Sequence, residues 1–279
     1  MRITPLQSGS SGNCVLVECG DTKILIDAGI GQKAIVQRLN EHGCSPEAID
    51  AIFVTHEHSD HVRGLAAMQK RFATETHLTT GTAQALSRKG KVASEAVLRP
   101  FFAGASISMK NLIVHSIPTE HDARDGVCFT VESVETGHRC GLWTDLGHVF
   151  GELREALPSL DGLLIESNFD PGLLRSGPYP AYLKHRIDGP KGHLSNQDAA
   201  ELVGRHAGPR LRWVCLGHLS EKNNCPDLAA RTHRRVAGEG RPVYVASRTR
   251  RSETLTLGGV ETSADVARTP TQLSFPLAD

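Results

Sequence analysis

The chain has 279 residues, enough for one large domain or two small ones with a sizeable core. Its 31 lysines and arginines balance 31 aspartates and glutamates, so net charge by itself indicates no nucleic-acid or membrane partner. No segment approaches the roughly 18 apolar residues of a membrane span, and the N-terminus lacks an apolar signal region. The seven cysteines form no C-x-x-C pair, so we expect reduced, buried thiols and a cytoplasmic location.

Short strands and turns are predicted for the first part of the chain. The apolar runs 15–17 and 23–26 flank a turn at 19–22, which is typical of a hairpin. Residues 34–42 have helical spacing, and residues 51–54 form an apolar run of strand type. A helix is predicted to follow from about residue 61 to 72.

Strands dominate the middle of the chain, at 106–108, 112–117, 127–134 and 140–144. Helices then alternate with strands; the helices lie near 149–157, 196–206 and 226–237, and the strands at 161–166, 211–216 and 242–245. This order predicts two sheets packed face to face with helices outside. We assign residues 1–258 to this domain and expect residues 259–279, which lose periodicity, to form a flexible tail.

The segment 55–61, with the sequence T-H-E-H-S-D-H, carries the strongest chemical signal. Residues two apart at a strand end point to one side, so His56 and His58 can face one metal ion. The helix that follows would place Asp60 and His61 beside a second ion. The alternative is a polar helix cap with spare histidines, which is disfavoured because burying so many unpaired imidazoles is costly.

Three more residues of ligand type follow apolar runs: His121, Asp145 and His218. A single histidine in such a place is usually structural, but together with the first motif these residues complete a site for two ions. One ion is assigned His56, His58 and His121. The second ion is assigned Asp60, His61 and His218, and Asp145 bridges the two ions. Such ligands suit Zn²⁺, with Mn²⁺ or Fe as alternatives.

The order of these motifs resembles that of the metallo-β-lactamase superfamily over about residues 1–258. The resemblance implies an α/β fold, a four-layer αββα sandwich in a single domain. Four segments are also similar to the WalJ/YycJ group of bacterial proteins: S-G-S-S-G-N at 8–13, I-E-S-N at 165–168, G-H-L-S-N at 192–196 and G-H-L-S-E at 217–221. This implies a 5′-to-3′ exonuclease for double-stranded DNA, with a role in DNA repair or metabolism. Phe169 departs from the pattern, because a histidine is expected after E-S-N.

The resemblance also implies residues beside the metal ligands. Asp27 matches a strand-end aspartate that supports the histidine loop, although an ordinary turn aspartate is the alternative. His193 resembles a phosphate-contacting histidine of phosphodiesterases such as ribonuclease Z, against a structural role at a helix cap. The 8–13 turn is either an anion nest or a plain hairpin turn. The predicted phosphate contacts are Ser8, Ser10, Ser11, Asn13, Asn168 and Ser195.

A mechanism follows from this assignment. Two cations lower the pKa of a shared water to roughly 7. Asp60 would hold the proton of this nucleophile, and His193 would act as general acid. The 72 residues between Asp145 and His218 are too few for a large inserted nuclease domain, so we expect a compact enzyme acting at a nucleic-acid end. Ten arginines between Arg205 and Arg251 form either a phosphate-tracking face or a solvated surface.

The tail contains Q-L-S-F-P-L at 272–277, which resembles the hexapeptide that docks bacterial proteins on the replication sliding clamp. Its contacts would be Gln272, Leu273, Phe275 and Leu277, and a random proline-containing tail is the alternative. Three rivals to a nuclease remain open: a metallohydrolase of a small ester, thioester, lactone or β-lactam, a diiron redox protein, and a non-catalytic metal-stabilised DNA-binding subunit.

Overall fold

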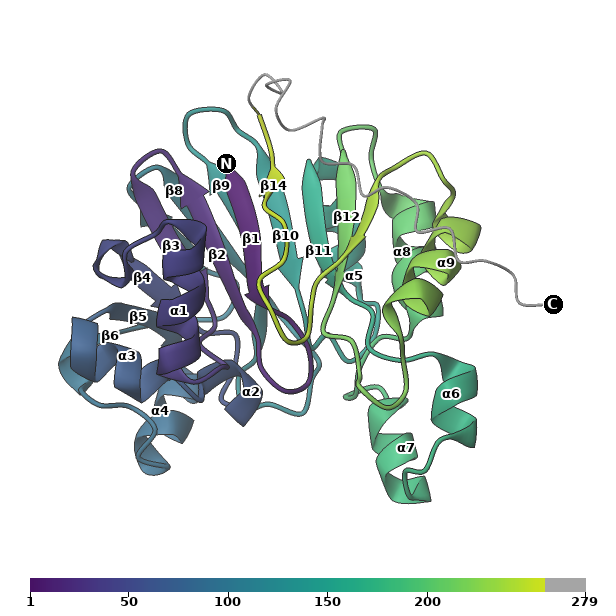
Figure 1. The fold of residues 1–279 in the computed structure, drawn as a ribbon, viewed down its shortest axis with the longest axis horizontal. Coiled ribbons are helices and arrows are strands. Elements are labelled where there is room, and N and C mark those ends of the chain that lie inside the picture. Colours follow the sequence, from purple (N-terminus) through teal and green to yellow (C-terminus); the bar gives the residue numbers. More distant parts are fainter. Residues whose placement is uncertain (259–279) are drawn as a thin grey trace.

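The structure is a computed structural model that describes residues 1–258. Two seven-stranded sheets pack face to face, with helices on their outer faces (Figure 1). This arrangement confirms the predicted four-layer αββα sandwich. The predicted clamp-binding residues Gln272, Leu273, Phe275 and Leu277 lie outside the described residues.

The first sheet has the strand order β14-β1-β2-β3-β4-β5-β6. Its strands are β1 (Arg2–Gln7), β2 (Cys14–Cys19), β3 (Thr22–Ile26), β4 (Ala51–Phe53), β5 (Glu75–Thr79), β6 (Leu98–Phe101) and β14 (Leu255–Thr256). Strands β2 and β3 form the predicted hairpin, whereas β3 to β6 run parallel. Strand β14 pairs with β1, so the end of the described chain returns to its beginning.

The second sheet has the order β13-β12-β11-β10-β9-β8-β7. Its strands are β7 (Ser106–Met109), β8 (Leu112–Pro118), β9 (Val127–Ser133), β10 (Arg139–Trp143), β11 (Gly162–Glu166), β12 (Trp213–Gly217) and β13 (Val243–Val245). Strands β10 to β13 run parallel. Strand β8 has the same direction, because it is antiparallel to β9, which is antiparallel to β10.

Helices cover both sheets on the outside (Figure 1). They are α1 (Gln32–His42), α2 (Ser59–Val62), α3 (Leu65–Phe72), α4 (Thr80–Arg88), α5 (Gly151–Ala156), α6 (Pro171–Ser176), α7 (Ala181–Ile187), α8 (Asn196–His206) and α9 (Pro226–Ala237). Short 3₁₀ turns occupy Pro46–Ala48, Glu95–Val97 and Leu157–Ser159. Within residues 1–258, none of the helices combines the length and the apolar character needed to cross a membrane.

The helix predicted over 61–72 is two helices, and that prediction was wrong about its continuity. Gly64 separates α2 from α3, and its amide donates to the carbonyl of Ala28 at 2.8 Å. A Cβ at this position would lie 2.3 Å from the carbonyl oxygen of Ile30. The break therefore comes from close backbone contact with the loop after β3, which only glycine permits.

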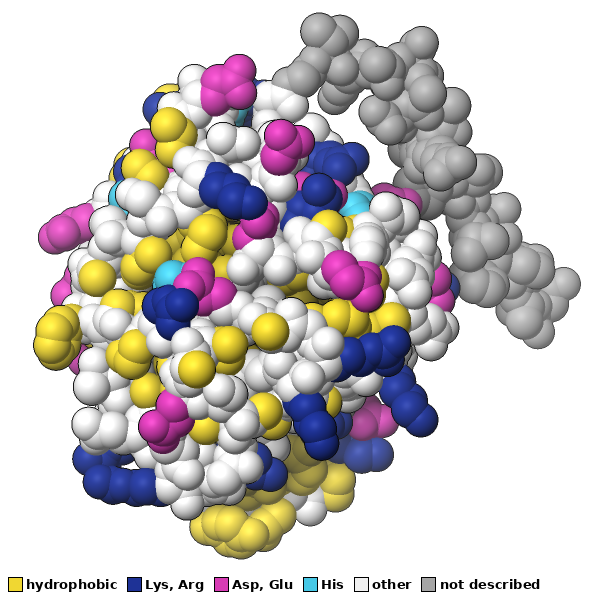
Figure 2. Space-filling view, turned by 90° about the vertical axis from the view of Figure 1, so that its left-hand side faces the viewer, with side chains coloured by type: hydrophobic (Ala, Val, Ile, Leu, Met, Phe, Trp, Pro, Cys, Tyr) yellow, Lys and Arg dark blue, Asp and Glu magenta, His cyan; other side chains and the backbone are white. Residues whose placement is uncertain are grey.

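Three apolar clusters hold the layers together. The cluster between the sheets contains Phe53 and Phe129, whose rings meet edge to face at 5.8 Å. A second cluster packs α1 and α3 on the first sheet, and a third packs α5, α8 and α9 on the second. All seven cysteines are free thiols, six of them buried. On the face shown in Figure 2, acidic and basic side chains are interspersed, as the balanced composition leads one to expect.

Candidate metal centre

Strand ends bring the predicted ligands together. In each sheet, the parallel strands end at the same edge, the lower one in Figure 1. Residues 54–58 follow β4, and Asp27 follows β3. In the second sheet the loop after β8 carries His121, while Asp145 and His218 follow β10 and β12. Because both sheets end at this edge, residues far apart in the sequence converge between them.

Three of these strand-end residues have left-handed backbones. Asp27, Asp145 and His218 have φ angles of 62°, 56° and 54°. Such a conformation costs a non-glycine residue about 1–3 kcal/mol and persists where neighbouring groups enforce it. The amide of Asp27 donates to the carbonyl of Phe53 at 2.8 Å, and that of His218 to Ser8 Oγ at 2.9 Å. The fold thus holds strained backbones where the centre needs sharp turns.

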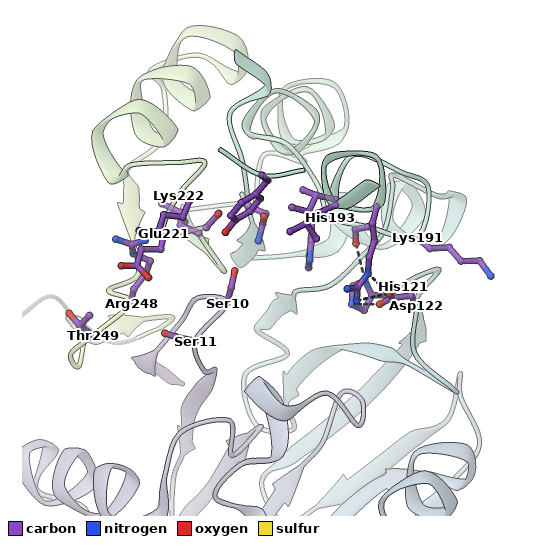
Figure 3. A pocket seen from close by; sticks show the side chains of 18 residues that line it. Ser10, Ser11, His121, Asp122, Lys191, His193, Glu221, Lys222, Arg248 and Thr249 are labelled. Atoms are coloured by element: carbon purple, nitrogen blue, oxygen red, sulfur yellow. Dashed lines mark hydrogen bonds and ion pairs between the residues drawn. The ribbon is translucent and has the colours of Figure 1, made fainter. Parts of the chain in front are cut away.

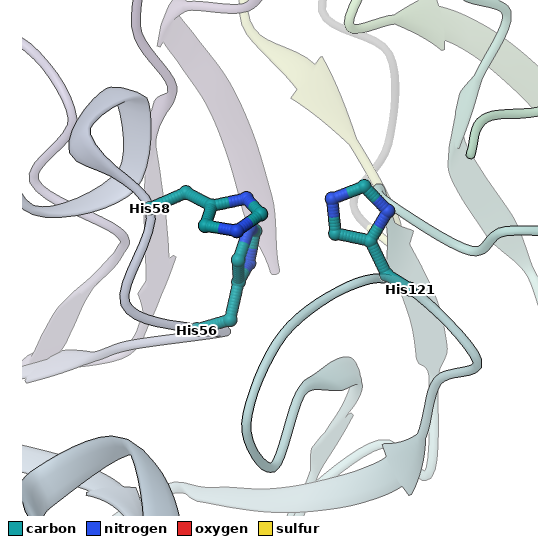
Figure 4. A group of neighbouring side chains, drawn as sticks. All are labelled: His56, His58 and His121. Atoms are coloured by element: carbon teal, nitrogen blue, oxygen red, sulfur yellow. The ribbon is translucent and has the colours of Figure 1, made fainter. Parts of the chain in front are cut away.

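The seven residues predicted as ligands meet in one cluster. His56, His58 and His121 approach one another with ligand atoms within 4.8 Å (Figure 4). Asp60, His61 and His218 form a second group with the same spacing. Asp145 lies between the groups, with one oxygen 3.7 Å from His121 Nε2 and the other 3.1 Å from His61 Nε2. The placement agrees with the two groups and the bridging carboxylate expected from the sequence.

Two buried atoms show that the cluster fits metal ions. His56 Nε2 is buried without a hydrogen-bond partner, and Asp145 Oδ2 is buried with only the ring of His61 beside it, at 3.1 Å. Buried polar atoms nearly always have partners, so an unpaired imidazole nitrogen beside a buried carboxylate oxygen fits a cation held between them. Nitrogen and oxygen donors of this kind suit divalent cations such as Zn²⁺ or Mn²⁺.

Hydrogen bonds behind the cluster orient its histidines. Four rings place Nδ1 near a protein oxygen, which leaves Nε2 for the centre, as is usual for metal-binding histidines. The pairs are His61 with Asp27 Oδ2 (2.6 Å), His121 with the Gly192 carbonyl (2.8 Å), His56 with Thr55 Oγ1 (3.0 Å) and His218 with Asn13 Oδ1 (3.2 Å). Asp27 also accepts from the amide of Thr55 at 2.8 Å, so this carboxylate contacts both His61 and the start of the histidine loop.

The electrostatics favour the ligand form of most of these groups, whereas His61 holds a proton when no cation is bound. Burial lowers the pKa values of His56, His58 and His218, which keeps these imidazoles neutral and able to bind a cation. Burial opposes ionisation of Asp60, but the hydrogen bond and charge of His61 lower the pKa of Asp60 to about 2. His61 itself has its pKa raised well above the ordinary range, because the carboxylates of Asp27 and Asp145 outweigh its burial.

His193 lies beside the centre and is held by Glu166, a residue that sequence reasoning missed. Glu166 is fully buried; its Oε1 lies 2.6 Å from His193 Nδ1, and its Oε2 accepts the amides of Leu146 and Leu194 at 3.1 and 3.2 Å. Burial disfavours a charged His193, but the charge and hydrogen bond of Glu166 raise its pKa to about 9. Glu166 is the last residue of β11, and Asp145 lies just after β10 in the same way. This position at a strand end is the sequence signal that could have identified Glu166.

The residues predicted to contact phosphate separate into two groups. Ser10 and Ser11 are exposed and line a cavity. Ser8, Asn13 and Ser195 are buried and use their side chains within the protein, so their structure argues against direct phosphate contact. Asn168 also lines the cavity, but its amide group donates to the carbonyl of His218 at 2.8 Å. Ser195 forms a capping box with Asp198 at the start of α8.

The cavity beside the centre has a volume of about 450 Å³, within the usual range for ligand sites. His121 and His193 line one end and Arg248 lines the other, with Ser10 between them (Figure 3). Asp122, which sequence reasoning also left without a role, has Oδ1 3.2 Å from His121 Nε2 and Oδ2 2.7 Å from Arg186. Phe169, where a histidine was expected, is buried and pairs through its backbone with Ser195.

The fold and this cluster define a metal-dependent hydrolase. The chain belongs to the metallo-β-lactamase superfamily, since residues 22–214 match the family described as the beta-lactamase superfamily domain. It is 37% identical to exodeoxyribonuclease WalJ of Streptococcus pneumoniae over 81% of this chain and 84% of the relative. It is 29% identical to exodeoxyribonuclease YycJ of Bacillus anthracis over 82% and 86% of the two chains. The crystal structure of Zn²⁺-bound PqqB from Methylobacterium extorquens shares the fold, with a TM-score of 0.70, 17% identity and coverage of 92% and 100%.

Proposed function

We propose that this protein is a dinuclear metal-dependent DNA exonuclease that releases nucleotides from the 5′ end of duplex DNA and serves DNA repair. One observation carries the proposal. A complete set of ligand-type side chains converges in a chain that matches an exodeoxyribonuclease at 37% identity over most of both proteins. Repair, strand polarity and the choice of Zn²⁺ or Mn²⁺ belong to the proposal.

The cations would be held by the seven converging side chains, namely His56, His58, Asp60, His61, His121, Asp145 and His218. Two divalent cations there would supply Lewis-acid activation of water and neutralise charge at phosphorus. Asp60 has a side chain that is 21% exposed and a pKa of about 2, so it stays ionised and can accept a hydrogen bond from attacking water. Asp27 and Asn13 keep the imidazoles of His61 and His218 oriented.

His193 is placed to deliver a proton. Its Nδ1 faces Glu166, so its Nε2 is the atom left to donate, and the side chain is 20% exposed and lines the cavity. With a pKa raised to about 9, the ring carries a proton at neutral pH and can donate it to the oxygen that leaves phosphorus. Substitution of His193 by alanine should therefore lower the rate about 10²- to 10⁴-fold while the metal content stays the same.

A substrate panel tests this proposal. The metal-loaded protein and Asp60→Ala are each incubated with 3′-labelled and 5′-labelled duplex DNA, single-stranded DNA and RNA, and with a small ester, a thioester and a lactone. Nucleotides released from the 5′ end of duplex DNA, with loss of this activity in Asp60→Ala, would support it. Turnover of the ester, thioester or lactone without any cleavage of nucleic acid would refute it in favour of the small-molecule alternative.

Two further expectations stay predictions. Docking on the sliding clamp through the 272–277 peptide is tested by calorimetry of a 268–279 peptide with the clamp, and absence of heat would refute it. The cytoplasmic location also stays a prediction, and fractionation of cells that produce the protein would test it.

A further inference from the structure

Arg248 is an unpaired cation in the wall of the cavity. Its side chain lines the end opposite His193 (Figure 3). Nη1 of its guanidinium is buried without a hydrogen-bond partner, and no hydrogen bond or ion pair joins the group to any other residue within 1–258. A guanidinium is always charged, and a partly buried charge without a partner costs free energy. An anion bound in the cavity would remove this cost.

The backbone around Arg248 is fixed rather than loose. The carbonyl of Ser247 accepts the amide of Ser8 at 3.0 Å, which ties this segment to the 8–13 turn. Ser247 Oγ accepts the amides of Thr249 and Arg250 at 3.3 and 3.2 Å. Arg38 donates to the Thr249 carbonyl at 2.7 Å. The guanidinium is therefore presented from a well-anchored turn, and little ordering is left to occur when an anion binds.

The absence of a side chain at Gly9 leaves room for the Arg248 side chain in the cavity wall. A Cβ at Gly9 would lie 2.9 Å from Arg248 Cγ and 3.3 Å from Cδ. The arginine stem can therefore lie directly on the backbone of Gly9, beside the exposed hydroxyls of Ser10 and Ser11. These two hydroxyls and the guanidinium line the same cavity and offer donors suited to a phosphate.

The carboxylates of the cavity leave this cation uncompensated. Asp122 is paired with Arg186, with Nη2 2.7 Å from its Oδ2. Glu221 lines the cavity, yet no ion pair joins it to Arg248 among the described residues. Lys222 adds another positive charge at the same end. By contrast, Arg210 in the same half of the chain is neutralised by Asp161 at 2.9 Å.

We propose, on the basis of the exonuclease function above, that Arg248 binds a second phosphate of the DNA strand while the reacting phosphodiester lies at the metal centre. Ser10 and Ser11 donate hydrogen bonds to the same phosphate. This contact selects a polynucleotide over a single small phosphodiester, because only a strand brings two phosphates into one cavity. A charge-assisted contact of this kind strengthens binding by about 10- to 100-fold.

The test combines a protein change with a substrate change. Arg248→Gln removes the charge from the cavity, and Arg250→Gln removes the same charge from an exposed neighbour as a matched control. Duplexes carry one neutral methylphosphonate in place of each phosphate nearest the 5′ end in turn, and kcat/KM is measured with native and variant proteins. Metal content and thermal melting show whether each variant keeps the fold and the centre.

We expect one position, away from the reacting phosphate, where the neutral linkage lowers native kcat/KM about 10- to 100-fold. Arg248→Gln should show most of this loss on unmodified DNA, and the neutral linkage should then cost the variant far less than it costs the native protein. The two changes remove the same charge–charge contact and leave only the contribution of Ser10 and Ser11. Should Arg248→Gln fail to fold, Arg248→Lys carries the test, with a smaller loss at the same position. Equal rates for Arg248→Gln and Arg250→Gln, or losses that multiply, would overturn this inference alone. A native protein that cleaves no DNA would overturn the proposed function together with it.

Discussion

Glu166→Gln should remove most of the charge stabilisation of His193 while preserving the shape of the site. Glutamine keeps an oxygen that can accept the Leu146 and Leu194 amides, which now donate to Glu166 Oε2 at 3.1 and 3.2 Å. It loses the negative charge that lies 2.6 Å from His193 Nδ1. The packing around the fully buried side chain is therefore retained, and the electrostatic effect is isolated.

The magnitude follows from the pKa of His193. Glu166, with smaller contributions from Asp145 and Asp60, raises it from 6.5 to about 9 against the effect of burial. A shift of this size corresponds to roughly 3 kcal/mol in favour of the protonated ring. Without the carboxylate the effect of burial is no longer outweighed by Glu166, so the pKa of His193 should fall from about 9 towards its ordinary value of 6.5 or below it. In the native protein, the stabilisation from this pair is complete below pH 6.5 and is lost as the pH rises towards 9.

NMR titration of His193 in the metal-free protein measures this pKa without interference from bound cations. We expect a value close to 9 in the native chain and a clearly lower value in Glu166→Gln. In the metal-loaded enzyme the same substitution should lower kcat about 10- to 100-fold at unchanged metal content. A native pKa near 6.5, or identical titration curves for the two proteins, would refute the assignment of Glu166 as the partner of His193.

Three further substitutions test the supporting structure. Asp27→Asn weakens the 2.6 Å contact to His61, so metal affinity should fall about 10- to 100-fold in chelator competition, and unchanged affinity would contradict that role. Ala73 has a φ of 52° at the exposed end of α3, so Ala73→Gly should relieve strain and raise the free energy of unfolding by about 1 kcal/mol. Urea denaturation measures this, and a loss of stability would argue against strain at this position. Ser195→Ala removes the capping box with Asp198 and should cost about 1 kcal/mol by the same measurement, whereas an unchanged midpoint would exclude this cap.

The sandwich was predictable because its longest helices and most apolar strands have clear periodicity in the local sequence. Helix α9 begins at Pro226 and ends at Ala237, the bounds predicted from its periodicity, and α8 also has its predicted bounds. Strand β5 was not predicted, because E-T-H-L-T lacks an apolar run. It is held by contacts between distant residues: the ring of His77 stacks on Phe53 at 4.5 Å, and Glu75 pairs with Arg99 at 2.6 Å. Strand β14 was missed for the same reason, since only its pairing with β1 defines it.

The metal cluster was predictable because each ligand follows an apolar strand and parallel strands end together. The surroundings were harder to predict, since burial decides what a polar side chain does. Asn13 and Ser8 suggested an anion nest, but the structure places them against His218, where they hold its ring and its backbone. Glu166 lies within the I-E-S-N segment, but only the fold brings it to within 2.6 Å of His193 and so gives it a role.

Cleavage of 5′-labelled duplex DNA under metal control tests the central claim most directly. The native protein is stripped with a chelator, assayed, and assayed again after Mn²⁺ or Zn²⁺ is restored, beside Asp60→Ala. The two-metal exonuclease predicts labelled mononucleotides from the first time points, their loss on chelation, their return with metal, and none from Asp60→Ala. A label that stays in the full-length strand throughout, in a protein that carries its metals, would contradict it.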